Sequence, residues 1–383
     1  MTRRVCVVGV GLADGPITPN MNANMLITQA FQRALADAGM ERSEVDGLAS
    51  AGYGGMHEVA VAEYLGLHPR WLESTSVGGS SFEFHLQHAY RAVEAGDVDT
   101  VAIVYGNPQV SERGRSLGTG RQFALNGPMA YEVPTGITLV GCYAIAAQRH
   151  MYQYGTTPAQ LASIAVQIRE HAAHNPQAMY RDPITVDDVL SSRLVADPLH
   201  KLDCCVISDG GCAVIVTTEE RAKHLAKKPV YVRGAASGMT HHSIQAMPDL
   251  TETIAKHTGA KAFADAGIQA DDVDTFQMYD SFTYTVLVCL EDLGFCKKGE
   301  GGPFVESGAL RVGGALPTNT DGGGLSATHP GMRGLFLICE ATRQLRGEAG
   351  ATQVGGAEIA VAHGSGGWLS TMGTVVLGTE PSR

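Results

Sequence analysis

The chain has 383 residues, of which 44% are apolar and 17% charged, and its formal net charge is −11. This composition can fill a sizeable core and excludes global disorder, and the length favours two domains or one large duplicated fold. An acidic chain without a basic run argues against a nucleic-acid partner. The sequence has no signal peptide and no apolar run long enough to span a bilayer, so we expect a cytoplasmic enzyme with no membrane partner.

The cysteines are expected to be structural. They lie at positions 6, 142, 204, 205, 212, 289, 296 and 339, most of them inside apolar runs, and form neither a CxxC pair nor a zinc-type spacing. We interpret them as buried reduced thiols, including the adjacent pair Cys204 and Cys205, although one catalytic thiol remains possible. No metal site is expected.

The chain contains an internal repeat. RALADAGMERSEVDGLAS at 33–50 matches KAFADAGIQADDVDTFQM at 261–278 without a gap. Each segment predicts a helix that ends at a glycine, then an acidic turn and a strand, and each follows another strand, at 5–11 and 229–238. We therefore divide the chain into two similar halves, 1–225 and 226–383.

The first half carries an insertion. A GGSS turn precedes a helix expected over 85–96, and the buried strand VDTVAIVYG follows. Residues 107–200 are polar and have no counterpart in the second half, so we expect a loop insertion that covers a site. Apolar strands alternating with helices in two halves predict an α/β fold with two mixed β-sheets sharing a central helical layer.

The second half offers polar residues at strand ends. Tyr279, Asp280 and Ser281 follow an apolar strand, where open α/β sheets place their chemistry. Asp280 or Ser281 could instead cap the next helix. His363 ends a further buried strand and could face the same cavity, or be structural.

A glycine-rich turn, NTDGGGLSATHPGMRG at 319–334, delivers His329 just before a predicted helix. The helix dipole disfavours an imidazolium there, and a neutral imidazole can donate a hydrogen bond to a developing oxyanion. The alternative is a capping or packing histidine. By contrast, GVGLADG at 9–15 does not complete a GxGxxG fingerprint in register, so no nicotinamide cofactor is expected.

The repeat, the GGSS turn, YDSF at 279–282, GGGLSATHPG at 322–331 and HGSGG at 363–367 together resemble the thiolase superfamily over nearly the whole chain. The resemblance implies a thiolase-like duplicated fold and matches His329 to the family's oxyanion-hole histidine.

All three cysteine positions of the family are empty in this chain. By resemblance the nucleophile falls at Gly79 and a second cysteine at Gly364. The HDCF motif of sterol-carrier-type thiolases becomes YDSF, with Tyr279 for its histidine and Ser281 for its cysteine. Because acyl transfer through an enzyme-bound thioester requires a thiolate, thiolase chemistry is not expected.

The resemblance points instead to the thiolase-like aldolases of bacterial steroid side-chain degradation, often named lipid-transfer proteins, which have glycine at the nucleophile site. Members cleave a β-hydroxyacyl-CoA into a ketone and a shorter acyl-CoA, with a small partner that carries a zinc ribbon and an OB fold. They also carry a second tyrosine beside the position of His329. This chain reads SATHPG there, so its acid–base arrangement and substrate are expected to differ.

We therefore predict retro-aldol cleavage of a coenzyme A thioester without a tightly bound cofactor. Tyr279, or a water that it orients, would take the β-hydroxyl proton, with His363 as the reserve base. His329 and backbone N–H groups near Ser80 or Gly364 would stabilise the enolate. A glycine at position 79 would leave room for a branched β-carbon.

Two alternatives stay open: a Claisen-type acyltransferase that uses Ser80, and a noncatalytic acyl-CoA-binding subunit. For the coenzyme A phosphates, the best candidate cations are Arg113, Arg115 and Arg121 in the insertion. The resemblance also implies a homodimer, paired through the strand VDTVAIVYG.

Overall fold

The computed structural model describes residues 3–52, 56–113 and 129–382. Its strands are β1 (Val5–Leu12), β2 (Gly47–Ser50), β3 (Trp71–Glu73), β4 (Thr100–Asn107), β5 (Leu194–Ala196), β6 (Leu199–His200), β7 (Gly210–Thr218), β8 (Val230–Met239), β9 (Thr275–Met278), β10 (Ile359–Gly366) and β11 (Thr371–Gly378). Its α-helices are α1 (Ala23–Ala38), α2 (His57–Leu65), α3 (Ser81–Ala95), α4 (Gln109–Arg113), α5 (Met129–Glu132), α6 (Leu139–Tyr154), α7 (Pro158–Ala172), α8 (Val186–Ser191), α9 (Glu219–Ala222), α10 (Ala255–Ala266), α11 (Thr283–Asp292), α12 (Gly301–Glu306) and α13 (Gly334–Arg346). Two short turns matter for the site: η2 (Gly78–Ser80) and the π-helical turn η7 (Gly323–Ala327).

Within the described ranges, nine strands form one mixed sheet in the order β3-β2-β4-β7-β1-β8-β11-β10-β9. The first five strands belong to the first half of the chain and the last four to the second half. The halves meet edge to edge at β1 and β8, through the antiparallel pairs Cys6↔Tyr231 and Val7↔Val230. The two predicted sheets are therefore joined into one by a seam of two residue pairs.

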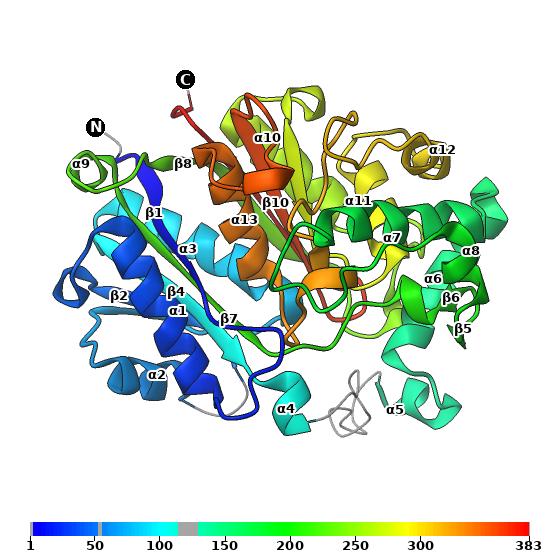
Figure 1. Ribbon diagram of the computed structural model, residues 1–383, viewed down its shortest axis with the longest axis horizontal. Helices are drawn as coiled ribbons and strands as arrows, with labels where there is room; N and C mark the ends of the chain where they lie inside the picture. The colour runs from blue at the N-terminus through cyan, green and yellow to red at the C-terminus, as the bar shows by residue number, and fades with distance from the viewer. Residues whose placement is uncertain (1–2, 53–55, 114–128, 383) are drawn as a thin grey trace.

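Two helices form the predicted central layer. α3 and α13 each contact strands from both halves, and they also contact each other. α1 covers the other face of β1, β4 and β7, and α10 covers the other face of β8 and β11 (Figure 1). The expectation of a thiolase-like α/β fold with a shared helical layer is confirmed.

The internal repeat is visible in how the outer helices rest on the sheet. A Cβ atom at Gly9 of β1 would lie less than 3.0 Å from the carbonyl oxygen of Ala34 in α1. In the second half, a Cβ atom at Gly234 of β8 would clash in the same way with the carbonyl oxygen of Ala262 in α10. Because Ala34 and Ala262 are equivalent in the repeat, both halves use a bare strand backbone to seat the same helix.

The segment 107–200 forms a separate group of helices, α4 to α8, with the small β5–β6 hairpin. Figure 1 shows α6 to α8 and the hairpin at the right of the molecule, opposite α9, with α4 in the lower middle. α7 contacts both η7 and the helices α11 and α12, so part of the segment packs directly on the glycine-rich turn.

The cysteines are free, as expected from their spacing, and Cys296 alone among the eight is only partly buried. The predicted dimer strand is wrong, however. VDTVAIVYG contains β4, which is hydrogen-bonded to β2 on one side and β7 on the other and so has no free edge. Among the helices of the described chain, none combines the length and apolar character that crossing a membrane requires.

Candidate active site

A tyrosine and a histidine from different elements meet in the interior. Tyr279 directly follows β9, and its backbone N–H donates to the carbonyl oxygen of His363 in the adjacent β10. Its hydroxyl lies 2.9 Å from Nε2 of His329, and the two rings pack edge to face with centroids 5.6 Å apart. Both side chains are buried. The two residues that the sequence singled out most strongly are thus directly hydrogen-bonded.

Asp280 holds the glycine-rich turn rather than capping the next helix. Its two carboxylate oxygens accept from the backbone N–H groups of Gly324 and Leu325, at 2.7 and 3.0 Å. The cap position of α11 is Phe282, without a side-chain bond. The interpretation of Asp280 as a cap for that helix is therefore wrong, because both of its carboxylate oxygens bind N–H groups of η7 instead.

A buried arginine completes this support. Arg333 has no exposed side-chain surface and binds both carboxylate oxygens of Asp321 at 2.6 Å. Its other terminal nitrogen donates to the carbonyl oxygen of Thr328 at 2.8 Å. Because both contacts lie within the same turn, the guanidinium fixes the backbone immediately before His329.

The backbone around His329 is fixed from the first half of the chain as well. The N–H of His329 donates to Oγ of Ser208 at 2.9 Å. The carbonyl oxygen of Pro330 accepts from the Tyr105 hydroxyl at 2.5 Å and from the Asn107 amide at 2.9 Å. The imidazole is therefore held at the interface between the two halves.

The position of the missing nucleophile is occupied by the tyrosine ring. A Cβ atom at Gly79 would lie less than 3.0 Å from two ring carbons of Tyr279 and 2.5 Å from the carbonyl oxygen of Ser365. The expectation that Gly79 leaves room for a branched substrate carbon is therefore wrong. The glycine makes space for the phenol of Tyr279 instead.

The two candidate serines have hydroxyl partners and no base. Oγ of Ser80 is buried and lies 2.9 Å from Oγ1 of Thr371. Oγ of Ser281 lies 3.0 Å from Oγ1 of Thr285. A serine nucleophile requires an adjacent base, and neither of these contacts supplies one.

His363 does not join the pair. Its Nδ1 lies 2.8 Å from Oγ1 of Thr374, which in turn bonds Thr258 of α10 on the outer face of the sheet. The next residue, Gly364, faces α3, where a Cβ atom would meet the carboxyl group of Glu83. Because neighbouring strand residues point to opposite faces, the imidazole of His363 lies on the side of the sheet away from the central layer.

Burial keeps the Tyr279–His329 pair neutral. Burial raises the pKa of the Tyr279 phenol well above its usual range, and nearby acidic groups, Cys205 first, act in the same direction. Burial, reinforced by the positive charge of Arg333, lowers the pKa of His329 to about 4. At neutral pH the pair therefore shares one proton between an uncharged phenol and an uncharged imidazole.

Other titratable groups fit the same pattern. Burial raises the pKa of Asp280 to about 6, and Arg333 opposes that shift. Burial also raises the pKa of the Cys205 thiol well above its usual range. A thiol held in its protonated form is a poor nucleophile, so Cys205 does not replace the missing cysteine.

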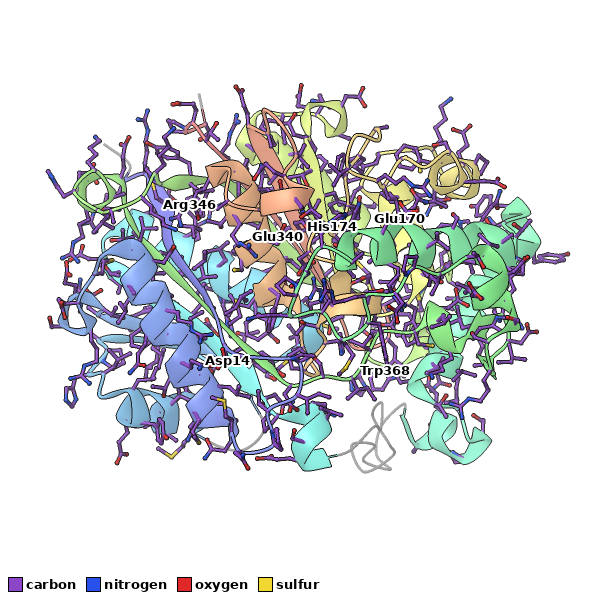
Figure 2. The ribbon with its side chains drawn as sticks, in the orientation of Figure 1. Asp14, Glu170, His174, Glu340, Arg346 and Trp368 are labelled. Carbon is purple, nitrogen blue, oxygen red and sulfur yellow. The ribbon has the colours of Figure 1, made fainter. Side chains whose placement is uncertain are left out.

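The predicted coenzyme A arginines cannot be located. Arg115 and Arg121 lie outside the described residues, and Arg113 ends α4 with its side chain outside the description. A cavity of about 960 Å³ opens between β1, α1 and α13, with Glu340 (Figure 2) and Thr328 in its wall. Its cations Arg33, Lys227 and Arg343 each face carboxylates, so none is left unpaired for a phosphate. In the part of the chain that the structure describes, no cluster of His, Cys, Asp or Glu could hold a metal ion.

Sequence reasoning missed two buried ionisable residues, Arg333 and Glu83. Arg333 stands in the glycine-rich turn itself, and a charge inside such an apolar stretch is a signal of a buried ion pair. Glu83 lies in the first turn of α3 between apolar residues and is 1% exposed. The sequence prediction concentrated on the glycines and serines of the η2 turn and did not consider Glu83.

A family described as Thiolase C-terminal domain-like matches residues 236–379. The acetyl-CoA acetyltransferase of Methanothermobacter thermautotrophicus is 35% identical over 95% of this chain and 97% of its own. The 17-hydroxy-3-oxo-4-pregnene-20-carboxyl-CoA lyase of Mycobacterium tuberculosis is 32% identical over 96% of this chain and 97% of its own.

A solved structure supports the same relationship. The structure named Ltp2-ChsH2(DUF35) aldolase superposes with a TM-score of 0.88 at 32% identity, covering 98% of this chain and 97% of that one. The chain belongs to the thiolase superfamily.

Proposed function

We propose that the protein cleaves a β-hydroxyacyl-coenzyme A by a retro-aldol reaction, giving a ketone and a shorter acyl-coenzyme A. The observation that carries this proposal is the phenol of Tyr279 in the space of the missing nucleophile, hydrogen-bonded to His329. An acyl group has no thiolate to bind there, while a substrate oxygen finds a hydroxyl and an imidazole. The name of the pregnene-carboxyl-CoA lyase relative supports a steroid side-chain thioester as the substrate.

The chemistry starts at the neutral pair. The β-hydroxyl passes its proton to the Tyr279 oxygen while the phenol proton moves to Nε2 of His329, so no free phenolate forms. The Cα–Cβ bond then breaks, the β-carbon becomes a ketone, and the electron pair forms an enolate. η2 leads directly into the N-terminus of α3, whose positive dipole end favours the thioester oxygen as it gains charge.

The test uses steroid and short-chain β-hydroxyacyl-coenzyme A thioesters, with ketone and acyl-coenzyme A as the measured products. Tyr279→Phe removes the hydroxyl without the ring, and we expect kcat to fall by about 10²-fold or more. Thr285→Val, which removes the hydroxyl partner of Ser281, is the matched control and should keep its activity. A fully active Tyr279→Phe enzyme would remove the tyrosine from the mechanism.

Acyl transfer is the second candidate, because the 35% identical relative is an acetyltransferase. It would require a covalent acyl adduct on Ser80 or on a thiol. Intact-mass spectrometry of protein incubated with acetyl-coenzyme A tests this directly, and an added acetyl group would replace the lyase proposal. Tight coenzyme A binding without turnover of any thioester would instead support a noncatalytic subunit.

The assembly is also part of the proposal. A homodimer is supported by the edge strand β3 and by exposed apolar side chains near it: Val59 and Tyr64 on α2 and Leu72 on β3. We expect Leu72→Asp to produce monomers in analytical ultracentrifugation, with Leu194→Asp, at another exposed site, as the control. The name of the aldolase structure supports a small DUF35-type partner, and co-purification with a small protein that carries a zinc ribbon and an OB fold tests it.

Two further elements of the proposal concern the chain itself. We propose the division 1–225 and 226–383, supported by the β1–β8 seam, with 107–200 covering the site through α7. Arg113, Arg115 and Arg121 remain our candidates for the coenzyme A phosphates. Replacing all three with Gln should raise KM for the thioester with little change in kcat.

A further inference from the structure

A buried carboxylic acid lies beside the proposed site without a partner. Glu83 is four residues beyond Gly79, in the first turn of α3, and only 1% of its surface is exposed. Neither carboxyl oxygen has a hydrogen-bond partner in another residue of the described chain. Because an unpaired polar group is costly to bury, a group kept in this state is expected to serve a purpose other than stability.

Three bare backbone positions make the space that this carboxyl fills. A Cβ atom at Gly364 of β10 would lie less than 3.0 Å from Oε2 of Glu83, and one at Gly373 of β11 would strike its Cβ. At Gly334, the first residue of α13, a Cβ atom would lie 2.5 Å from Oε2 of Glu83 and 2.5 Å from the carbonyl oxygen of Gly79. The carboxyl is therefore wedged between α3, α13 and the β10–β11 hairpin, next to Gly79.

Tyr279 packs against the same short turn, at Gly79. A side chain at Gly79 would meet the ring of Tyr279, and a side chain at Gly364 would meet the carboxyl of Glu83. These are two of the three positions at which the sequence resemblance lacks a cysteine. At these two positions a phenol and a carboxyl group from elsewhere in the chain occupy the space of the missing thiols.

The surroundings keep this carboxyl protonated. Burial raises the pKa of Glu83 well above its usual range, and the N–H of its own residue opposes that shift. A neutral carboxylic acid can give a proton, and the carboxylate that it leaves can take one back.

We propose that Glu83 is a catalytic acid that gives its proton to the α-carbon of the enolate, and removes that proton in the reverse direction. This inference rests on the proposed function. The enolate electron pair forms a new C–H bond as the O–H bond of Glu83 breaks. The proton that left the β-hydroxyl, held by the Tyr279–His329 pair, returns through solvent to the carboxylate, so nothing is oxidised or reduced.

The experiment follows deuterium into the α-position of acetyl-coenzyme A and propionyl-coenzyme A in D2O by NMR, a reaction that needs no C–C cleavage. For Glu83→Gln, an uncharged replacement of the same shape, we expect exchange and cleavage both to fall by about 10²-fold or more. Glu94→Gln, the same change at a partly buried carboxylate in the last turn of α3 that pairs with Arg91, is the control and should be unchanged. An infrared band of a protonated carboxyl group at neutral pH should disappear in Glu83→Gln alone.

Should Glu83→Gln fail to fold, Glu83→Asp keeps the acid but withdraws it by one methylene, and exchange should slow by about tenfold or more. Exchange that the wild type shows and the Glu83 variant lacks supports the role of Glu83. If the wild type exchanges but cleaves no thioester, only the lyase proposal is refuted. Normal exchange and cleavage in Glu83→Gln would overturn the role of Glu83 and leave the lyase proposal standing. A wild-type protein with neither activity would overturn both.

Discussion

The contact between Gly79 and the ring of Tyr279 makes a sharp prediction for the variant Gly79→Ala. The added methyl carbon would lie less than 3.0 Å from two ring carbons and 2.5 Å from the carbonyl oxygen of Ser365. Non-bonded carbons prefer about 3.5–4.0 Å, so the ring must retreat by about 1 Å. Its hydroxyl lies 2.9 Å from Nε2 of His329, a normal hydrogen-bond length, so a movement of about 1 Å away from His329 breaks the bond.

Two effects should add to the loss of stability. Overpacking a well-filled interior costs about 1–3 kcal/mol. Leaving the buried phenol and imidazole unpaired costs a further amount of about 1–3 kcal/mol. Activity should fall by about 10²-fold or more, since the proton path from Tyr279 to His329 is interrupted.

The assay is urea unfolding followed by the fluorescence of the two tryptophans, together with kcat for thioester cleavage. Gly355→Ala is the matched control, because a Cβ atom there meets nothing within 4 Å, and its free energy of unfolding should change by less than about 0.5 kcal/mol. If Gly79→Ala unfolds at the same urea concentration as Gly355→Ala and stays active, the tyrosine ring does not fill the nucleophile position.

Three other outcomes follow from the buried charges. Asp280→Asn should destabilise the protein by about 3 kcal/mol in urea unfolding, because it weakens the bonds to η7 and leaves Arg333 undercompensated; an unchanged midpoint would contradict this. Burial lowers the pKa of His329 to about 4 and that of His363 to about 3 in the folded protein. In the unfolded chain both imidazoles have the usual pKa of about 6.5, so below that pH the unfolded chain binds more protons than the folded one. Their stabilisation, present above pH 6.5, should be lost as the pH falls, by about 3 kcal/mol for His329 alone, and urea midpoints that stay constant from pH 7 to 4.5 would refute it. Glu83 has the opposite sign, because its folded pKa is raised: its contribution is lost as the pH rises above about 4.5, so Glu83→Gln should gain stability over wild type from pH 5 to 8, measured by the same unfolding curves.

The sequence was most informative where local chemistry leads to a single interpretation. Strand-end polarity predicted Tyr279, and a glycine-rich turn before a helix predicted His329, and both lie in the candidate site. The repeat at 33–50 and 261–278 predicted the two halves because each copy carries its own helix cap and strand.

What could not be predicted depends on contacts between distant segments. His363 was assigned to the site because it ends a buried strand, but a strand buried on both faces has no pattern that says which face each residue takes. The expected dimer strand rests on the family resemblance, which points to β4, whereas β3 lies at the edge of the sheet, and no local pattern identifies an edge strand. The meeting of Glu83 with Gly364 and Gly334 joins segments about 250 residues or more apart, which no local pattern records.

The outer helices rest on glycine in both halves, and this has a consequence for altering the protein. A methyl group at Gly9 or Gly234 would press against the main chain of Ala34 or Ala262. Because no side chain could rotate out of the way, the whole helix would have to move away from the sheet. Such changes would alter the distance between the outer helix and the sheet, and not the side chains of the candidate site. Searches for new substrate preference should therefore vary side chains on the connecting loops and leave these two strand positions as they are.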